Sequence, residues 1–443
     1  MRVWPQGGLW RHPDFLKLWG AETISVFGSQ FTALALPLVA VLVLDASAFA
    51  VSALFVVTTL PFILLSLPAG VWVDRMRRKP ILVWADLGRA AALATIPVAY
   101  VADALTLPHL YVVGFAVGVG TVFFDVSYQS YLPSLVPRDR LVEGNSQLEL
   151  SRSASQLGGP GTAGGVVGAI GAPLAIVANV VSFVLSAILL FRIRKEERLP
   201  EPREGAPKPS MLREAKEGFG YVVRHPFLRP ISICTGTSNF FWSMTGALLV
   251  VYAIRELRLS PALLGLAFSI GNAGPLLAAL TVARIASRLG VGRTLLGTTV
   301  LFATAPIFYP LATERLAVFF LVAAGVLGGF SAVAYNITQV SFRQAITPER
   351  LQGRMNSVIR FLVWGTMPLG ALLGGTLGTW LGLRPAMWIA AGGALLAILP
   401  IALSPVRKIR DMPEPLVEDA LAETPLAEGI LAPPSAAPAA PEP

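Results

Sequence analysis

The segment Gly70–Pro80 reads GVWVDRMRRKP and lies between two long apolar stretches of the chain. It places a glycine four residues ahead of Asp74 and Arg75, with a further basic cluster behind them. A glycine here lets a neighbouring helix approach closely, and an aspartate at the end of an apolar helix needs a partner for its charge. Arginines in a short loop keep that loop on the cytoplasmic side of a membrane. The segment therefore predicts a tight cytoplasmic turn between two membrane-spanning helices.

The composition is that of a membrane protein, because 54% of the 443 residues are hydrophobic and only 14% are charged. A helix that crosses a bilayer needs about 20 apolar residues. The chain contains twelve such stretches. They cover approximately residues 18–44, 49–73, 80–102, 107–131, 147–170, 173–192, 228–253, 261–285, 293–312, 316–341, 355–380 and 384–404.

The positions of Lys and Arg predict which loops face the cytoplasm. With both termini inside, 28 of the 35 Lys and Arg residues fall in cytoplasmic segments and only four in exterior loops. We therefore expect a multi-pass protein of a bacterial cytoplasmic membrane with both termini in the cytoplasm. The net charge of +9 is dispersed over these loops. It forms no contiguous basic face, so the lipid bilayer is an expected partner and nucleic acid is not.

An internal duplication supports two similar halves. Arg-His-Pro at 11–13 recurs at 224–226, an offset of 213 residues, and Asn-Ser at 145–146 recurs at 356–357, an offset of 211. Matching strings in chain order at nearly one offset indicate two six-helix halves in parallel orientation.

These patterns divide the chain into four segments. Residues 1–193 form an N-terminal six-helix half, 194–226 a charged and Pro-rich cytoplasmic linker, and 227–406 a C-terminal six-helix half. Residues 407–443 become acidic and then Pro/Ala-rich, and we expect this tail to be disordered.

Ionisable residues inside the predicted spans cost about 2.5–3.5 kcal/mol each on insertion scales, so each one calls for an explanation. Asp86 and Arg89 stand three residues apart, as do Glu149 and Arg152. That spacing places both charges of a pair on one helical face. We interpret both pairs as structural.

Glu22 on the first span and Asp125 on the fourth have no such local partner. A carboxylate removed from water favours its protonated form, so it can bind and release a proton when access alternates between the two sides. We therefore regard Glu22 and Asp125 as candidates for proton coupling. The alternatives are a Glu22 side chain that reaches the interface and an Asp125 held by Asp74 and Arg78.

The Gly70–Pro80 segment resembles the G-x-x-x-D-R-x-x-R-K signature between the second and third helices of the major facilitator superfamily. The resemblance implies an all-α membrane protein with twelve transmembrane helices in two six-helix halves and a substrate path between the halves. It also implies a cytoplasmic latch made by Gly70, Asp74, Arg75 and Arg78. In the family the signature aspartate lies at the amino end of the eleventh helix when the cytoplasmic side is closed.

The fifth span contains GGPGTAGGVVG at residues 158–168. It resembles the G-P-x-x-G-G signature of antiporters in the superfamily, with one extra residue between Pro160 and Gly164. The resemblance implies that Gly159, Pro160, Gly164 and Gly165 form an antiporter-like motif. Small residues allow tight helix contact and a proline allows a kink, so a plain packing helix is the alternative.

The strings at 24–37, 86–89 and 145–146 resemble the branch that holds enterobactin exporters and macrolide efflux pumps, the transmembrane secretion effectors. This implies a proton-coupled exporter of a small amphipathic molecule such as a drug, antibiotic or siderophore. An importer or facilitator of the same fold is the alternative. Candidate contacts along the substrate path, each of which could equally join helices, are Asn239, Trp242, Asn272, Tyr335, Asn336 and Gln339.

The sequence lacks the signatures of other classes of membrane protein. An ATP-driven pump needs a G-x-x-x-x-G-K-[ST] loop, which does not occur. A membrane enzyme needs clustered His, Cys or carboxylates, whereas His12, His109 and His225 are scattered and Cys234 is the single cysteine. We therefore expect no enzymatic activity, no metal and no cofactor, and we expect a monomer. The pattern alone does not exclude a channel, although the duplicated halves argue against one.

Overall fold

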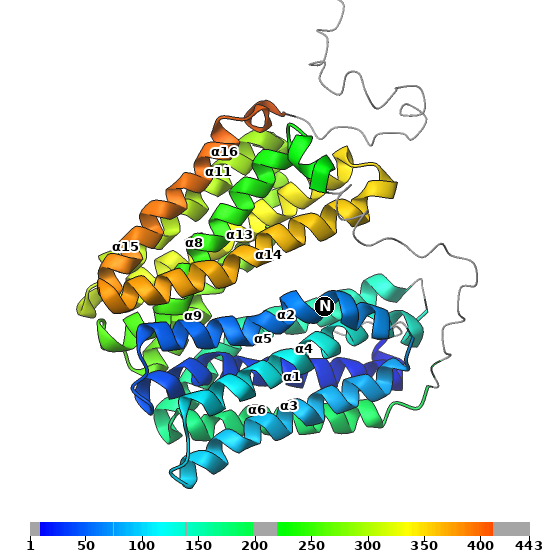
Figure 1. Cartoon of the computed structure of the whole chain (residues 1–443). Coiled ribbons are helices and arrows are strands. Elements are labelled where there is room, and N and C mark those ends of the chain that lie inside the picture. Colours follow the sequence, from blue (N-terminus) through cyan, green and yellow to red (C-terminus); the bar gives the residue numbers. More distant parts are fainter. Residues whose placement is uncertain (1–8, 74, 138–139, 196, 198–218, 411–443) are drawn as a thin grey trace, which may run out of the picture.

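The structure is a computed structural model that describes residues 9–73, 75–137, 140–195, 197 and 219–410. All regular secondary structure in these residues is helical (Figure 1). Most of the predicted linker and tail, residues 198–218 and 411–443, lies outside the described residues.

Each predicted span coincides with a helical segment. Eleven segments are long and apolar enough to cross a membrane, and α5, with 30 residues, occupies the place of the twelfth. Asn272 separates α9 from α10, and short 3-10 turns interrupt the ninth and twelfth segments. The predicted all-α membrane fold is confirmed. In the first half the helices are α1 (Pro13–Leu42), α2 (Ala48–Val73), α3 (Arg78–Val101), α4 (Leu107–Leu135), α5 (Leu141–Ile170) and α6 (Ala172–Phe191). In the second half they are α8 (Leu228–Arg255), α9 (Pro261–Gly271), α10 (Ala273–Leu289), α11 (Val291–Thr304), α12 (Phe308–Leu311), α13 (Ala317–Ile346), α14 (Glu349–Trp380), α15 (Leu383–Ala394) and α16 (Ile398–Ala402).

The helices pack into two groups that touch along two seams. In the first group α1 packs on α5 and α6, and α3 packs on α4 and α6; in the second, α8 packs on α14 and α15, and α13 on α10 and α11. The seams between the groups are α2 against α14 and α5 against α9. In Figure 1 the groups meet at the left, where α1 joins α2, and separate toward the right, where α6 finishes. We call these the convergent and divergent ends.

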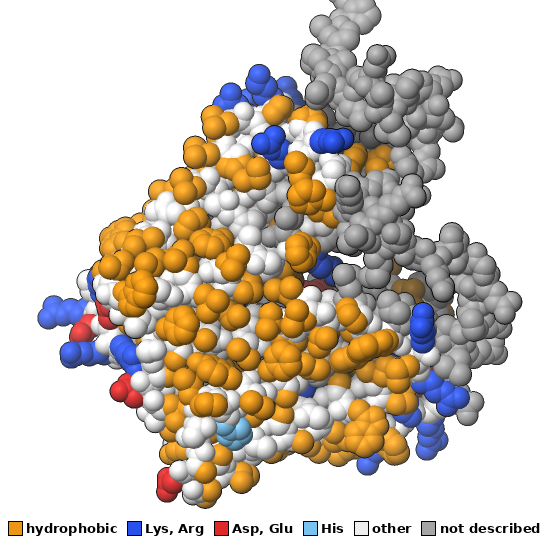
Figure 2. Space-filling model, in the orientation of Figure 1, with side chains coloured by type: hydrophobic (Ala, Val, Ile, Leu, Met, Phe, Trp, Pro, Cys, Tyr) orange, Lys and Arg blue, Asp and Glu red, His pale blue; other side chains and the backbone are white. Residues whose placement is uncertain are grey.

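The surface is consistent with a membrane location. Figure 2 shows hydrophobic side chains over the sides of both groups, with charged side chains gathered toward the ends. An apolar band between charged ends is what a bilayer requires of a spanning protein.

The Arg-His-Pro repeat begins the first helix of each group in the same way. His12 accepts the N–H of Phe15 through Nδ1, with a nitrogen–nitrogen distance of 3.1 Å. His225 Nδ1 accepts from the N–H groups of Phe227 and Leu228, at 3.2 and 3.4 Å. The first N–H groups of a helix have no partner within it, so an imidazole acceptor stabilises the helix start.

Other helix ends repeat as well. Gly171 and Gly382 precede α6 and α15 with φ values of 85° and 93°, a conformation that favours glycine. Asp45 and Arg258 follow the first helix of each group with φ values of 44° and 51°. The two groups therefore share local geometry at corresponding positions.

Candidate functional site

The α5–α9 seam brings two backbones into direct contact. A Cβ atom on Gly164 would lie 2.5 Å from the carbonyl oxygen of Pro261 and 2.9 Å from Cα of Gly265. A Cβ atom on Gly265 would lie 2.2 Å from the carbonyl oxygen of Pro160. Only glycine fits at these positions, so Gly164 of the antiporter-like motif forms part of the contact between the groups.

Two hydrogen bonds cross this seam because Pro160 alters the hydrogen bonding of α5. Proline has no N–H, so the carbonyl of Gln156, four residues earlier, loses its normal helical donor. Asn272 of the other group donates its Nδ2 to this carbonyl at 2.7 Å. One residue further on, the N–H of Gly161 donates to Ser269 Oγ, also at 2.7 Å. Asn272, which the sequence placed along a substrate path, therefore joins the two groups.

The other two glycines of the motif differ. A Cβ atom on Gly159 would lie 2.3 Å from Cγ of Gln30, so a glycine here allows α1 to pack closely against α5. Gly165 has no atom within 4 Å of its Cβ position. The motif thus serves packing within the first group as well as between the groups.

The α2–α14 seam continues the contact at the convergent end. The N–H of Phe49 donates to Thr379 Oγ1 at 3.1 Å. Beside it, Arg255 Nη2 lies 2.5 Å from Asp45 Oδ1 and forms an ion pair between the groups. The Asp45 side chain is 96% exposed, so water and salt weaken this pair.

Aromatic side chains continue this seam further along both helices. The rings of Phe62 and Trp364 lie 6.1 Å apart at an angle of 34°. The sequence carries no signal for this pair, because apolar residues in a span do not reveal which helix they face.

A buried ion pair lies inside the first group. Asp86 and Arg89 of α3 contact each other, and their side chains are 0% and 3% exposed. The Arg89 guanidinium lies 4.4 Å from the ring centre of Phe124 and 4.2 Å from that of Phe183. The aromatic faces and the carboxylate together hold the cation in place, as a structural pair requires.

Glu22 pairs with a residue that the sequence assigned elsewhere. Arg152 Nη2 lies 3.6 Å from Glu22 Oε1, so the ion pair joins α1 to α5 and does not join Arg152 to the exposed Glu149. Glu22 is buried, whereas the Arg152 side chain is 46% exposed. The second oxygen, Glu22 Oε2, is buried without a hydrogen bond to any described residue. The expected pair within α5 is therefore corrected to a pair between helices.

Asp125 of α4 lies close enough to Glu22 and Arg152 to interact with both electrostatically. It is half-buried and has no hydrogen bond or ion pair within the part of the chain that the structure describes. The buried Tyr128, one helical turn later, is in electrostatic range of Glu22 as well. Glu22, Asp125 and Arg152 thus share a region enclosed by α1, α4 and α5, with the buried Asp86–Arg89 pair of α3 also in electrostatic range.

The signature loop makes contacts other than those of the implied latch. Asp74 lies outside the described residues, Arg75 is exposed, and no atom lies within 4 Å of the Cβ position of Gly70. Among the described residues, no helix makes the expected close approach at Gly70. Arg78 Nη1 donates to Glu197 at 3.0 Å, and the same carboxylate accepts the backbone N–H of Arg78 at 2.6 Å. Glu197 thus caps the start of α3.

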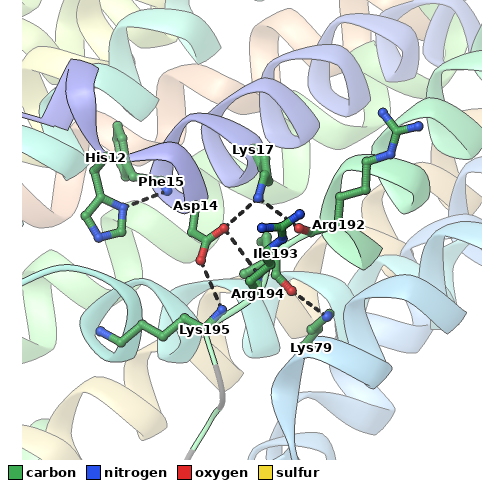
Figure 3. Close-up of polar contacts among 9 residues, drawn as sticks. All are labelled: His12, Asp14, Phe15, Lys17, Lys79, Arg192, Ile193, Arg194 and Lys195. Carbon is green, nitrogen blue, oxygen red and sulfur yellow. Dashed lines mark hydrogen bonds and ion pairs between the residues drawn. The ribbon is translucent and has the colours of Figure 1, made fainter.

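Residues 192–195 form a strap across the divergent end of the first group (Figure 3). The Asp14 carboxylate accepts the backbone N–H groups of Arg194 and Lys195, at 3.2 and 3.0 Å. Lys17 Nζ donates to the same carboxylate at 2.7 Å. The strap therefore fixes the start of the predicted linker to α1.

Two predicted path residues of the second group contact neighbouring helices. The Trp242 ring packs against Phe302 of α11 with centroids 5.2 Å apart. The Tyr335 hydroxyl lies 3.0 Å from Thr235 Oγ1 of α8. Both side chains thus join helices within this group.

The remaining path candidates make fewer contacts with neighbouring helices. Gln339 Nε2 donates to Asn336 Oδ1 at 3.0 Å, and both residues belong to α13. Asn336 is exposed, whereas Gln339 is buried with Oε1 lacking a hydrogen bond to described residues. Asn239 is half-buried on α8. Within the described part of the chain, none of these three side chains forms a hydrogen bond between helices.

Comparison with known proteins agrees with this architecture. The MFS-type transporter YfiS of Bacillus subtilis is 26% identical over 405 residues, which cover 89% of this chain and 94% of YfiS. The multidrug efflux pump Tap of Mycolicibacterium fortuitum is 26% identical over 415 residues, covering 90% of this chain and 97% of Tap. The crystal structure of a bacterial homologue of the iron transporter ferroportin in an inward-facing state has the same fold, with a TM-score of 0.70 at 19% identity over 90% of this chain and 99% of that one.

The family model described as transmembrane secretion effector matches residues 9–429. Together with the helical architecture, this match shows that the chain belongs to the transmembrane secretion effector family of major facilitator transporters.

Proposed function

We propose that the protein is a secondary active exporter that couples proton entry to efflux of a small amphipathic molecule, such as a drug, antibiotic or siderophore. The observation that carries this proposal is the group of Glu22, Arg152 and Asp125 inside a membrane-spanning bundle. Charges at such depth are costly and mark ion or substrate pathways. The similarity to a multidrug efflux pump favours export.

We infer that the divergent end faces the cytoplasm, because the short loops there are basic. The convergent end then faces outward and is closed by the α2–α14 and α5–α9 seams, which include the Arg255 ion pair at that end and the Asn272 hydrogen bond near the middle of α5. In this interpretation the described conformation opens inward, and export requires the two seams to part while the divergent end closes.

Glu22 and Asp125 are the proposed proton carriers. Protonation of Glu22 removes its charge and therefore its attraction to Arg152, which leaves a cation without a partner between the helices. Asp125 is in electrostatic range of Glu22 and has no ion pair among the described residues. Transfer of the Arg152 contact from one carboxylate to the other provides a physical link between protonation and helix position.

The test uses everted membrane vesicles that contain the protein and a lipophilic cationic dye. With an acidic lumen, an exporter moves dye inward as protons leave, and Asp125→Asn should lose this gradient-driven flux. Asp103→Asn, a change at an exposed loop acid, is the matched control and should transport normally. Gradient-driven flux in the opposite direction would identify an importer, and dye movement that ignores the proton gradient would identify a facilitator.

A further inference from the structure

A groove of about 640 Å³ lies between α1, α5 and α6, on the side of α1 away from Glu22. Its walls are mostly apolar, with a few hydroxyl groups from serine and threonine. It is lined by Trp19, Thr23, Ile24, Phe27, Gly28, Phe31, Ser151, Ala154, Ser155, Ala178, Val181, Ser182 and Leu185. Glu22, Arg152 and Asp125 are absent from this lining, so the groove is separate from the proposed proton site.

The groove exists because α1 touches both neighbours closely while those neighbours diverge. A Cβ atom on Gly28 would lie 1.9 Å from Ser182 Oγ, so α1 and α6 are in close contact. The corresponding contact of Gly159 with Gln30 holds α1 against α5. At its outer edge Val181 and Leu185 are 49% and 44% exposed, so the groove opens toward the lipid.

The length of the groove matches one leaflet. Trp19 and Phe31 stand twelve residues apart on α1, which corresponds to about 18 Å of helix. One leaflet contributes about 15 Å of hydrocarbon. A single extended acyl chain therefore fits along the groove.

The divergent end of the groove carries the features of a membrane interface. Trp10 and Trp19 pack edge to face with ring centres 5.2 Å apart, and tryptophan is enriched at the level of lipid headgroups. Lys17 there is held by Asp14. The exposed Arg192 side chain points away from the other residues drawn in Figure 3, and its carbonyl accepts a hydrogen bond from Lys17 Nζ at 2.8 Å.

Arg192 is placed to bind a phosphate. It follows α6 seven residues after Leu185 of the groove, or about 10 Å along the helix. The headgroup layer begins at the end of the hydrocarbon and is about 5–8 Å thick, which an arginine side chain reaches. Guanidinium groups bind phosphate oxygens with two parallel hydrogen bonds.

We propose that this groove binds an anionic phospholipid of the inner leaflet, with one acyl chain between α5 and α6 and the phosphate on Arg192. The inner-leaflet assignment rests on the orientation given under the proposed function. The binding site itself does not depend on transport.

The test is native mass spectrometry of the purified full-length protein titrated with phosphatidylglycerol or phosphatidylcholine of identical chains. The first phosphatidylglycerol should bind about fivefold more tightly, since a basic residue near an anionic surface contributes about 1 kcal/mol. Arg192→Gln should remove this preference, whereas Arg407→Gln, at an exposed arginine of the other group, should keep it. Ala154→Leu should weaken binding of both lipids, and Ala91→Leu, at an exposed alanine of α3, should not.

Equal affinities of the two lipids for the wild-type protein would overturn the headgroup assignment, as would a preference that survives Arg192→Gln. Unchanged binding to Ala154→Leu would overturn the groove as the site of the chain. These outcomes do not depend on dye flux. If the wild-type protein binds lipid as expected but does not transport dye, only the proposed export function is refuted.

Discussion

Replacement of Asn272 by leucine should loosen the seam between α5 and α9. Leucine has a similar size but cannot donate to the Gln156 carbonyl, which Pro160 leaves without a helical donor. Hydrogen bonds between membrane helices are worth about 0.6 kcal/mol on average and up to about 1.7 kcal/mol. With RT near 0.59 kcal/mol, this loss should raise the ratio of separated to closed seams about 3- to 18-fold.

A thiol in the seam reports this ratio. Ser52 is fully buried, and a Cβ atom on Gly375 of α14 would lie 2.6 Å from the Ser52 Cβ. In a Ser52→Cys background, a hydrophilic maleimide reaches the thiol only when the seam parts. The native Cys234 is buried and needs no removal. The labelling rate of the protein in nanodiscs should therefore rise about 3- to 18-fold on Asn272→Leu, in proportion to the open population.

Asn145→Leu is the matched control, because Asn145 is exposed and its side chain donates to the Leu141 carbonyl of its own helix. It should leave the labelling rate unchanged. A rate that is unchanged or lower in Asn272→Leu would refute the role of this hydrogen bond in holding the groups together.

Three other perturbations have defined outcomes. Asp45→Asn should raise labelling less than Asn272→Leu, and 1 M salt should erase the difference from wild type because the Arg255 pair is exposed. Asp14→Asn weakens the strap and should speed trypsin cleavage after Lys195, measured by mass spectrometry; an unchanged cleavage rate would contradict the strap contacts. Burial lowers the pKa of His225 to about 4, below its unfolded value of about 6.5. The unfolded chain then binds the proton first, so thermal stability should fall as pH drops from 6.5 to 4, and His225→Gln should flatten this slope.

The spans and the helix starts could be predicted because both depend on local sequence. Apolar length sets each crossing, and the Arg-His-Pro strings place an acceptor beside free N–H groups at His12 and His225. Positions three residues apart on one helix also fixed the Asp86–Arg89 pair. These interactions need no knowledge of which helices are neighbours.

The contacts between helices could not be predicted in the same way. Spacing assigned Arg152 to Glu149, but the face of α5 that carries Arg152 turns toward α1, where Glu22 is buried. Asn272 looked like a ligand contact because its acceptor is a backbone carbonyl of another helix, and no side chain marks that carbonyl. The sequence does not predict the groove between α1, α5 and α6 either, since the residues that line it are ordinary for a membrane span.

Helix α5 connects the proposed proton site to the seam between the groups. Arg152 and Gln156 stand four residues apart on α5, so the partner of Glu22 on the side of α1 and the backbone acceptor for Asn272 on the side of α9 lie about one helical turn apart. A partly exposed ion pair is worth up to about 1 kcal/mol, and the hydrogen bond about 0.6–1.7 kcal/mol. Because the two contributions are similar, loss of the ion pair on protonation of Glu22 is large enough to change the population that the Asn272 contact sets. In the proposed mechanism, proton binding at Glu22 and opening of the seam are therefore coupled through the position of α5.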